Sequence, residues 1–409
     1  FFCSGNEKPM KKTRLSIFMS HPIQYQISLI RNIASEKEID LSVYYYWDFG
    51  VKETFDKEFN TKIKWDMPLF GGYKHTFLRN YAFSQSTSFF GCINFGVISK
   101  FLKNKPDVVL IFGWALFSNW IVMMMAFISR TPLLIYGESP LSHEFSKSGF
   151  RSYVRKILLN FIFSRADKLL YIGSENKKFY KSLGIKDSKL VFVPYSVDNK
   201  SHLENARILK PKKQQIKQEL GLSKDSVVVL FTGKLIEKKR PFDLLKAFEI
   251  SQKSLTGKNT YLLFAGDGEQ KQDLEKYTKS NNINNVIFLG FQNQTKLPKI
   301  YTVADLFVLP SGLGETWGLV VNEAMYYGLP IIVSNLVGCS SDLVTSNNGR
   351  IFTYGDVNEL SENIVDLVLD EKLREELGAN SPPIVKYHNQ EYAASQIAIA
   401  ATTSKKNIN

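Results

Sequence analysis

Short apolar runs recur along the chain, and longer segments with helical spacing separate them. Most of these runs are apolar throughout, which is typical of parallel strands buried on both faces. In the first half the predicted strands are Leu15–Met19, Leu41–Trp47, Val108–Phe112, Leu133–Tyr136, Leu169–Ile172 and Leu190–Val193. In the second half they are Val227–Thr232, Tyr261–Ala265, Val286–Leu289, Leu306–Leu309 and Ile331–Ser334. Strands that alternate with helices in this way predict an α/β fold of two doubly wound, Rossmann-like domains.

The predicted domains meet near residue 198. A turn-rich segment, Pro194–Asn199, leaves a strand there, and a charged helix begins at Lys210. We therefore place an N-terminal domain at residues 10–198 and a second domain at residues 199–382.

The two ends of the chain are treated separately. Residues 1–9 precede the expected start at Met10 and are left out of the fold prediction. The sequence Ser381-Pro382-Pro383 predicts a break, and a helix is expected over Glu391–Ala401. Residues 383–409 should thus form a tail that returns to the first domain.

The most apolar stretch, Trp120–Ile128, is well short of the roughly 20 residues that span a bilayer. We expect a buried helix between two strands there, in a soluble or peripheral protein. The cysteines, Cys3, Cys92 and Cys339, lie far apart and form no C-x-x-C or Cys/His cluster. This pattern excludes a disulfide scaffold and a zinc ribbon, and it fits the reducing cytoplasm.

Charge is distributed unevenly along the chain. The 409 residues carry a formal net charge of +13, of which residues 1–199 carry +11 and residues 200–409 carry +2. Such asymmetry favours an anionic partner for the first half: nucleic acid, an acidic lipid surface or a phosphorylated acceptor. Two basic and aromatic segments, 97–105 and 145–161, either rest on an anionic membrane surface or are core-facing helices with a solvated basic side.

The strongest chemical signal lies at Ser311–Pro330, after a predicted strand. A glycine-rich loop opens a helix near Trp317, so the amides of Gly318 and Leu319 would point out of the helix start and suit a diphosphate. Glu315 and Glu323 are separated by seven residues, and their carboxylates suit the hydroxyls of a ribose and a sugar. Either glutamate alone would also fit a helix-dipole or solvated role.

Two further loops follow predicted strands. In the first, Gly233 allows close approach to the backbone, and Lys234 and Lys239 offer cations for phosphate oxygens. A solvated basic loop is the alternative there. The second contains Gly266 and Gly268, which by themselves indicate an ordinary tight turn. All these loops lie where open α/β sheets bind ligands.

These elements, in this order, resemble family 4 of the retaining GT-B glycosyltransferases, whose E-x7-E motif corresponds to Glu315 and Glu323. The resemblance covers residues 200–380, and Pro194–Asp198 looks like a variant of the family's Pro-Asn-Gly-Val-Asp motif. The first half is similar more loosely, through His21–Gln26, to a subset involved in cell-envelope polysaccharide assembly. The resemblance implies a GT-B architecture, in which two Rossmann-like domains face a cleft. It also implies that residues 10–198 bind the acceptor and that residues 199–382 bind a nucleotide-sugar.

The resemblance also implies roles for single residues. Glu323 would hold the ribose of a nucleotide-sugar, and Glu315 would contact the hydroxyls of the donor sugar. Lys239 and Lys234 would neutralise the diphosphate, and the amides of Gly318 and Leu319 would hold its distal phosphate. Other donor-binding positions would be Gly233, Gly266 and Phe291.

Such enzymes require no metal, because cations and helix amides stabilise the departing diphosphate. This sequence contains no D-x-D motif. We expect no metal ion and no cofactor besides a donor of the UDP or GDP type.

The chain departs from the family at two first-domain positions. His21-Pro22 stands where a Gly-Gly pair is frequent, and Glu138 stands where a histidine is frequent near the reacting sugar. His21 and Glu138 are therefore candidates for hydrogen bonding to the acceptor, with a structural role as the alternative.

We expect a metal-independent hexosyltransferase that acts with retention of configuration on a saccharide or lipid-linked acceptor in cell-envelope polysaccharide synthesis. The expected location is the cytoplasm, including the inner face of the cell membrane. A GT-B epimerase or phosphorylase and a non-catalytic nucleotide-sugar-binding protein remain alternatives. Nucleic acid is not an expected partner, because there is no zinc spacing, RNP-like motif or basic repeat.

Overall fold

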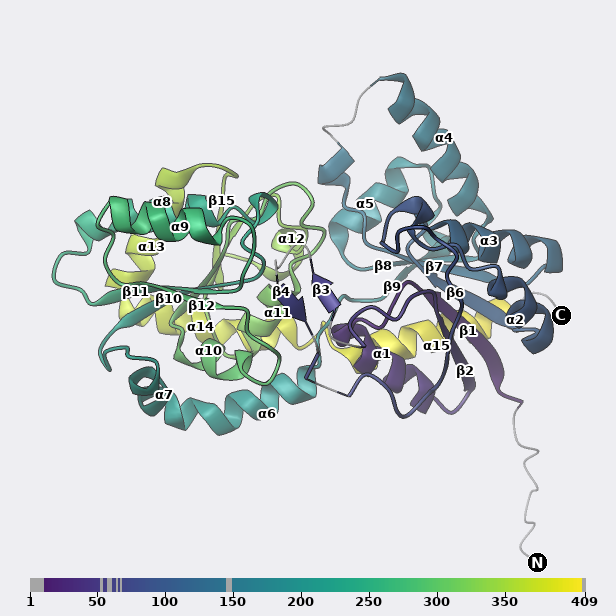
Figure 1. The fold of residues 1–409 in the computed structure, drawn as a ribbon, viewed down its shortest axis with the longest axis horizontal. Coiled ribbons are helices and arrows are strands. Elements are labelled where there is room, and N and C mark those ends of the chain that lie inside the picture. The colour runs from purple at the N-terminus through teal and green to yellow at the C-terminus, as the bar shows by residue number, and fades with distance from the viewer. Residues whose placement is uncertain are drawn as a thin grey trace, which may run out of the picture.

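The computed structural model describes residues 11–51, 54–56, 61–63, 65–66, 68–144 and 149–406. These residues form two α/β domains, each built on a parallel sheet with helices on both faces (Figure 1). The predicted fold class is confirmed. Cys3, the expected start at Met10 and residues 145–148 of the second basic segment lie outside the described residues.

The first sheet has the order β5-β2-β1-β6-β7-β8-β9, and all its neighbouring strands are parallel. Its strands are β1 (Thr13–Met19), β2 (Ile39–Tyr45), β5 (Lys74–Phe77), β6 (Val108–Phe112), β7 (Leu133–Gly137), β8 (Lys168–Tyr171) and β9 (Leu190–Phe192). Its helices are α1 (Gln24–Ser35), α2 (Gly96–Asn104), α3 (Phe117–Ser129), α4 (Phe150–Arg165) and α5 (Ser174–Ser182). A separate antiparallel pair joins β3 (Thr54–Asp56) to β4 (Thr61–Ile63).

Side chains on both faces of this sheet are buried, as apolar runs without alternation require. Leu15 and Ile17 of β1 point into a core shared with α1 and the C-terminal helix α15 (Gln390–Lys406). Phe18 points to the opposite face, where α2, α3, α4 and α5 complete a second core. The strand is therefore enclosed by helices above and below.

The second sheet has the order β12-β11-β10-β13-β14-β15, again entirely parallel. Its strands are β10 (Val227–Thr232), β11 (Thr260–Ala265), β12 (Val286–Gly290), β13 (Leu306–Leu309), β14 (Ile331–Ser334) and β15 (Gly349–Phe352). Helices α8 (Pro241–Ser254), α9 (Lys271–Ser280) and α13 (Val357–Leu369) cover one face (Figure 1). On the other side lie α6 (Asn199–Leu209), α7 (Lys213–Glu219), α10 (Leu297–Val303) and α14 (Glu371–Val385). Two short helices, α11 (Leu319–Tyr326) and α12 (Ser340–Leu343), lie near the other domain.

The C-terminal helix α15 packs on the first domain, against α1 and β1. Near its end, Lys405 Nζ lies 2.9 Å from Asp107 Oδ2, and the other oxygen of Asp107 lies 2.8 Å from Arg14 Nη2. At its start, Gln390 Nε2 donates to Tyr25 O at 2.7 Å. The chain thus crosses from the first domain to the second near α6 and returns in α15.

The secondary structure differs from the sequence prediction in some strands and at one predicted break. Strands β3, β4, β5 and β15 were not predicted. Of these, β5 and β15 are edge strands with exposed positions and lack a continuous apolar run. The break predicted at Ser381–Pro383 is wrong, since α14 continues to Val385. Ser381 Oγ donates to Leu329 O at 2.7 Å, and this tertiary contact holds the segment in its helical path through the two prolines.

The helix predicted at Trp120–Ile128 is α3, but it is only partly buried. Ile121, Val122 and Ala126 lie in the core, whereas Met124, Phe127 and Ile128 are exposed. The expectation of a buried helix is therefore wrong for its outer face. Among the described residues, no helix combines the length and apolarity needed to cross a membrane.

The strand that leads to the glycine-rich loop is anchored at its start by Asp305. The carboxylate oxygens of Asp305 accept hydrogen bonds from Lys213 Nζ (2.7 Å), Lys217 Nζ (3.1 Å) and Val228 N (2.9 Å). Burial opposes ionisation, but the two lysines and the hydrogen bonds hold the pKa of Asp305 below its usual value. Asp305 thereby ties α7 and β10 to β13.

We predict that Asp305→Asn lowers the free energy of unfolding by about 3 kcal/mol at pH 7, because Lys217 stays buried without its counter-charge. A lowered folded-state pKa adds stability above the unfolded value of about 3.9, so the difference should shrink as the pH falls below about 4. Urea unfolding of the wild type and the variant at several pH values measures this difference in the free energy of unfolding. Asp273→Asn, which removes an exposed pair with Lys276, is the control and should change little. Equal effects of the two variants would contradict the prediction.

Candidate functional site

The candidate site lies at the carboxyl ends of β10 and β13. Strand order reverses between these neighbours, which is the position where open α/β sheets form a ligand crevice. The loop after β10 meets the loop after β13, since Gly312 N donates to Lys238 O at 2.9 Å. The loop after β11 joins them, and a Cβ on Gly266 would lie 1.8 Å from Gly233 O. Gly266 is therefore required by the close approach of two backbones.

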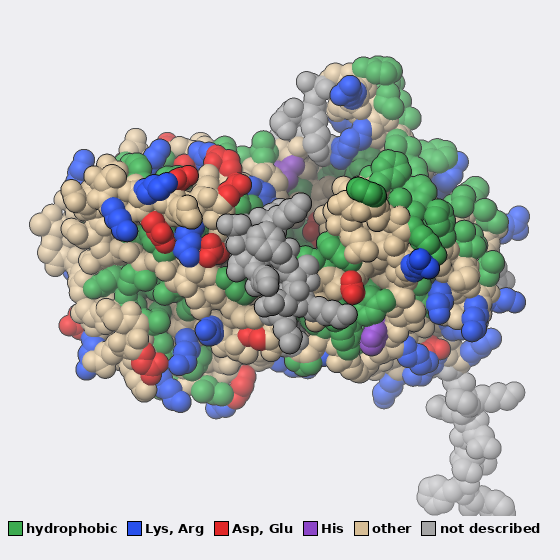
Figure 2. Space-filling model, in the orientation of Figure 1, with side chains coloured by type: hydrophobic (Ala, Val, Ile, Leu, Met, Phe, Trp, Pro, Cys, Tyr) green, Lys and Arg blue, Asp and Glu red, His purple; other side chains and the backbone are tan. Residues whose placement is uncertain are grey.

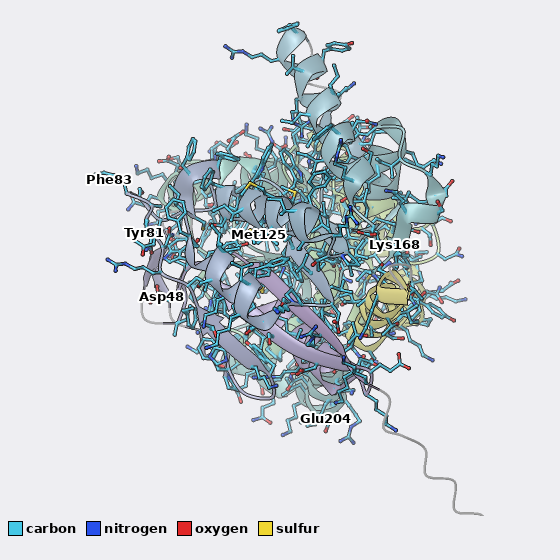
Figure 3. All side chains as sticks on the ribbon, turned by 90° about the vertical axis from the view of Figure 1, so that its right-hand side faces the viewer. Asp48, Tyr81, Phe83, Met125, Lys168 and Glu204 are labelled. Carbon is cyan, nitrogen blue, oxygen red and sulfur yellow. The ribbon has the colours of Figure 1, made fainter. Side chains whose placement is uncertain are left out.

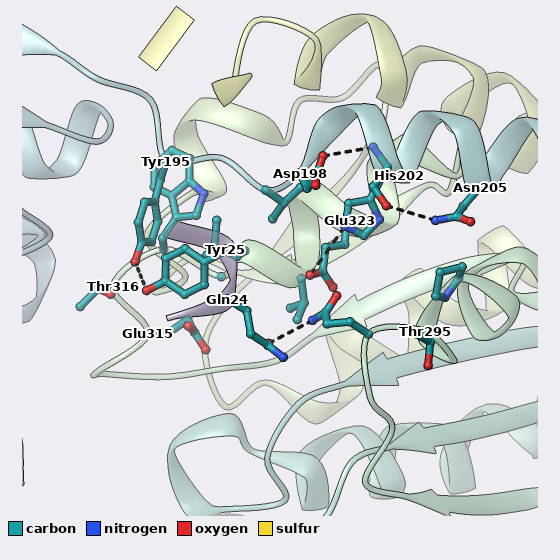
Figure 4. A pocket seen from close by; sticks show the side chains of 18 of the residues that line it. Gln24, Tyr25, Tyr195, Asp198, His202, Asn205, Thr295, Glu315, Thr316 and Glu323 are labelled. Carbon is teal, nitrogen blue, oxygen red and sulfur yellow. Dashed lines mark hydrogen bonds and ion pairs between the residues drawn. The ribbon is translucent and has the colours of Figure 1, made fainter. Parts of the chain in front are cut away.

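A cavity of about 640 Å³ opens beside these loops, between the two domains (Figure 4). Residues from the first domain, the crossing segment and the second domain line it. They are Gln24, Tyr25, Asp66, Glu138, Tyr195, Val197, Asp198, Ser201, His202, Asn205, Lys239, Gln294, Thr295, Pro298, Glu315, Thr316, Trp317, Gly318, Leu319, Val320 and Glu323. The carboxyl ends of both sheets thus face one space.

Lys239 and Glu315 form an ion pair in this cavity, and both side chains are largely buried. Lys239 belongs to the loop after β10 and Glu315 to the loop after β13. Burial opposes ionisation of Glu315, yet the charge and hydrogen bond of Lys239, with Lys238 nearby, hold the pKa of Glu315 below its usual value. The lowered pKa favours an ionised Glu315 at neutral pH, and the pair ties the two loops together.

Helix α11 starts at the cavity wall, with Gly318 as its N-cap in the left-handed region at φ +96°. A Cβ on Gly318 would also lie 2.9 Å from Leu309 Cδ2 and 3.2 Å from Val337 Cγ1. The first N–H groups of a helix have no acceptor within the helix. Gly318, Leu319 and Val320 line the cavity, so the positive end of the helix faces it.

Glu323 is buried one turn further along α11. Its Oε2 accepts from Tyr301 Oη at 2.6 Å, and Tyr301 Oη lies 2.9 Å from Thr232 Oγ1. Its Oε1 lies 4.0 Å from His202 Nε2, and Figure 4 shows the two side chains beside each other. Burial lowers the pKa of His202, and the nearby Glu323 carboxylate partly offsets this effect. The lowered pKa favours a neutral imidazole.

On the first-domain side, Glu138 follows β7 and accepts from Tyr195 Oη at 2.7 Å. Tyr195 Oη lies 2.6 Å from Tyr25 Oη, and because the Tyr195 proton points to Glu138, Tyr25 donates to Tyr195 (Figure 4). Burial raises the pKa of Glu138, and the hydrogen bond from Tyr195 opposes the rise. Glu138, Tyr195 and Tyr25 form a hydrogen-bonded row along the cavity.

The structure brings together most, but not all, of the residues predicted from the sequence. Among the described residues, Glu315, Glu323, Lys239, Gly318, Leu319 and Glu138 line the cavity, whereas Lys234, Gly233, Gly266, Phe291 and His21 do not. Gly233 and Gly266 support the adjoining loops. Phe291 lies near Trp65, with ring centroids 6.5 Å apart. His21 packs edge-on against Phe49 and Trp47 at 5.3 and 5.7 Å.

Sequence reasoning missed the residues that close the cavity from α6 and from the crossing segment. His202 and Asn205 lie on α6, a helix without a recognisable motif. Tyr195 could have been found, because it stands in Pro194–Asp198 where a polar residue is usual. Tyr25 similarly follows His21-Pro22 at the start of α1.

The domain that carries the two glutamates has known relatives. Residues 212–382 match the family model of the glycosyl transferases group 1. The match covers α7 to α13 and all strands of the second sheet, which is less than half of the chain. This part of the chain is therefore similar to the glycosyl transferases group 1.

Relatives that align over more than half of the chain are glycosyltransferases of polysaccharide and lipid-linked sugar synthesis. CapM, a capsular polysaccharide biosynthesis glycosyltransferase of Staphylococcus aureus, is 26% identical over 287 residues, which are 69% of this chain and 73% of CapM. UDP-Gal:alpha-D-GlcNAc-diphosphoundecaprenol alpha-1,3-galactosyltransferase of Escherichia coli is 27% identical over 250 residues, 60% of this chain and 62% of that protein. The latter alignment spans less than two thirds of the enzyme.

A solved structure shares the fold over nearly the whole chain. HepE of Anabaena in complex with UDP has a TM-score of 0.71 at 18% identity and covers 96% of this chain and 100% of its own. The two-domain GT-B architecture is therefore common to both proteins.

We predict that Gly318→Ala destabilises the protein more than Gly355→Ala does. Both glycines have a positive φ, which costs an alanine about 1–2 kcal/mol, but only Gly318 has a side chain against its missing Cβ. Overpacking should add about 1–3 kcal/mol at Gly318. Chemical unfolding of the two variants measures the difference, and equal losses would show that the packing around the helix start imposes no constraint.

Proposed function

We propose that this protein is a retaining hexosyltransferase that takes its sugar from a nucleotide diphosphate donor of the UDP or GDP type. The observation that supports this most directly is the convergence of Lys239, Glu315, Glu323 and the start of α11 on one cavity. A cation and a helix start suit a diphosphate, and carboxylates suit sugar hydroxyls. The UDP bound by HepE, a protein of the same fold, agrees with this assignment.

In the proposed complex, Glu323 accepts from the ribose hydroxyls and Glu315 from hydroxyls of the donor sugar. Lys239 and the amides of Gly318 and Leu319 neutralise the diphosphate, with Lys234 as a second cation at the adjoining loop. Gly233, Gly266 and Phe291 do not line the cavity and would support the loops that form the donor site. Metal independence is part of the proposal, because a cation and a helix start at the cavity could stabilise the leaving group without a metal ion.

The chemical step breaks the bond between C1 of the sugar and the distal phosphate oxygen. The electron pair departs with the nucleoside diphosphate, and a hydroxyl oxygen of the acceptor bonds to C1 on the same face. Its proton passes to the leaving phosphate oxygen. Nuclear magnetic resonance of the product reports its anomeric configuration, and inversion would refute retention.

The acceptor is proposed to be a saccharide or lipid-linked sugar of the cell envelope, as the names of the Staphylococcus and Escherichia relatives suggest. Glu138 is the first-domain group best placed to bond it, because its carboxyl lines the cavity in a row with Tyr195 and Tyr25. His21 remains a weaker candidate outside the lining. We further propose that the enzyme works in the cytoplasm at an anionic membrane surface.

We predict that Glu323→Gln weakens UDP binding by about 10- to 100-fold, the loss expected for hydrogen bonds to a charged group. Glutamine keeps an acceptor for Tyr301, so the fold should be retained. Thermal-shift titration with UDP, GDP, ADP and CMP identifies the nucleotide. Replacing UDP by 2′-deoxy-UDP should weaken binding to the wild type and have less effect on the variant.

The matched control is Glu362→Gln, an exposed position on α13. Wild-type affinity in both variants would refute the ribose role of Glu323. A donor that binds but is never hydrolysed or transferred would indicate a non-catalytic nucleotide-sugar-binding protein.

We predict that Lys239→Met lowers kcat by about 100- to 1000-fold, the usual cost of removing one group that stabilises developing charge. Lys238→Met, at the exposed neighbouring position, is the control and should retain most activity. Transfer rates with a labelled donor give kcat for both variants. The same measurement with and without a chelator shows whether the reaction needs a metal ion. Comparable losses in the two variants would contradict a specific role for Lys239.

A further inference from the structure

Two neighbouring helices of the first domain expose large apolar side chains. We name this surface the α3–α4 face. It comprises Met124, Phe127 and Ile128 of α3, and Phe150, Tyr153, Val154, Ile157, Leu158 and Phe161 of α4. Phe127 is 69% exposed and Phe150 is 79% exposed. Figure 2 shows hydrophobic side chains gathered over the domain that carries α3 and α4.

The first half of α4 has little support from the protein. The buried residues of α4 are Leu159, Ile162 and Phe163, all in its second half. Its first turns project beyond the body of the domain in two views at right angles (Figures 1 and 3). Helical stability in proteins comes mainly from packing of an apolar face. A partner that covered the apolar side chains in the first half of α4 would therefore stabilise this part of the helix.

Charge restricts what that partner can be. Helix α4 carries Arg151, Arg155, Lys156 and Arg165, and neither α3 nor α4 contains Asp or Glu. The Arg165 guanidinium lies 3.5 Å from the ring centroid of Phe161 and 5.9 Å from that of Phe127. A second copy would bring one cationic helix against another, which is unfavourable. Apolar side chains among cations instead match a surface with hydrocarbon beneath anionic groups.

An apolar groove of about 670 Å³ runs between the two helices. Met123, Met124, Phe127 and Ile162 are among the residues that line it, and Arg130 and Arg165 lie at its wall. Asp167, the acidic residue among those described there, accepts from Leu133 N at 2.8 Å and so is already engaged. The groove therefore suits a hydrocarbon chain with an anionic head.

We infer that the α3–α4 face is the docking surface for a phospholipid bilayer that contains anionic lipids, with one lipid chain in the groove. The other basic segment of the sequence does not share this character. Helix α2 buries Val97 and Phe101, and of its large apolar side chains only Leu102 is exposed. It is therefore closer to an ordinary surface helix. The inference deepens the proposed function, on which it rests for its biological meaning, and it names the elements that meet the membrane.

Vesicle co-sedimentation tests the inference without any turnover. The full chain should bind vesicles of equal parts phosphatidylcholine and phosphatidylglycerol more tightly than vesicles of phosphatidylcholine alone. The pair Arg151→Gln and Lys156→Gln should weaken binding by about 25-fold, since each basic residue near such a surface contributes about fivefold. That loss should diminish at high salt. The pair Phe150→Ser and Tyr153→Ser should weaken binding by at least about 10-fold at any salt concentration.

The control variants are Lys253→Gln with Lys258→Gln, and Tyr387→Ser, all exposed outside the α3–α4 face. The thermal shift caused by UDP should be the same in every variant. A variant that no longer binds vesicles but keeps this shift has lost membrane docking and has kept the donor site of the proposed reaction. Equal binding to both vesicle types, or equal losses in test and control variants, would overturn the inference. A dimer in the absence of lipid that dissociates on Phe150→Ser would also overturn it, in favour of self-association.

Discussion

The buried ion pair between Lys239 and Glu315 is the constraint on which the site depends. Burying either charge without its partner would be energetically costly. If one loop moved, the charged side chain of the other loop would remain buried and unpaired or would become exposed to solvent. The pair therefore fixes the loop after β10 against the loop after β13. The glycine-rich turn at Gly318 then places the start of α11 on the same cavity. Both loops can meet because β10 and β13 are neighbours at the point where the strand order reverses.

The two domains are joined by specific polar contacts. Asp342 of α12 accepts from Ser174 N and from Ser174 Oγ, at 3.0 and 2.6 Å, and so caps the first turn of α5 in the other domain. Tyr195 works from the crossing segment, since its hydroxyl donates to Glu138 while its carbonyl accepts from Asn322 of α11 at 3.2 Å. A change in the angle between the domains must therefore disturb both the helix cap and the row that includes Glu138.

The sequence was sufficient for features that follow from continuous apolar runs and from glycine. β6, β10, β13 and β14 were predicted with the bounds that the structure has, because parallel strands buried on both faces leave a continuous apolar signal. Edge strands such as β15 lack that signal. The loops after β10 and β13 were also predicted to share one sheet edge, and they do.

Other features depended on tertiary contacts that no local pattern encodes. Whether Pro382 ends α14 depends on the contact of Ser381 with Leu329. The presence of His202 beside Glu323 depends on how α6 packs against α11. The hydrogen bond between Glu138 and Tyr195 joins the loop after β7 to the crossing segment. Such side chains become recognisable only when the elements have been placed in space.

The uneven charge of the chain can now be related to structure. A phosphate site needs few cations if they are held in place. Residues 200–409 have a net charge of only +2, yet Lys239 and the start of α11 both lie at the cavity. The excess of the first domain is of another kind, since α4 carries four cations among exposed apolar side chains. A net charge of +11 on residues 1–199 therefore does not indicate the donor site. Part of this charge lies on the α3–α4 face, for which we propose an extended anionic partner. Such a partner attracts distributed charge and does not require convergent geometry.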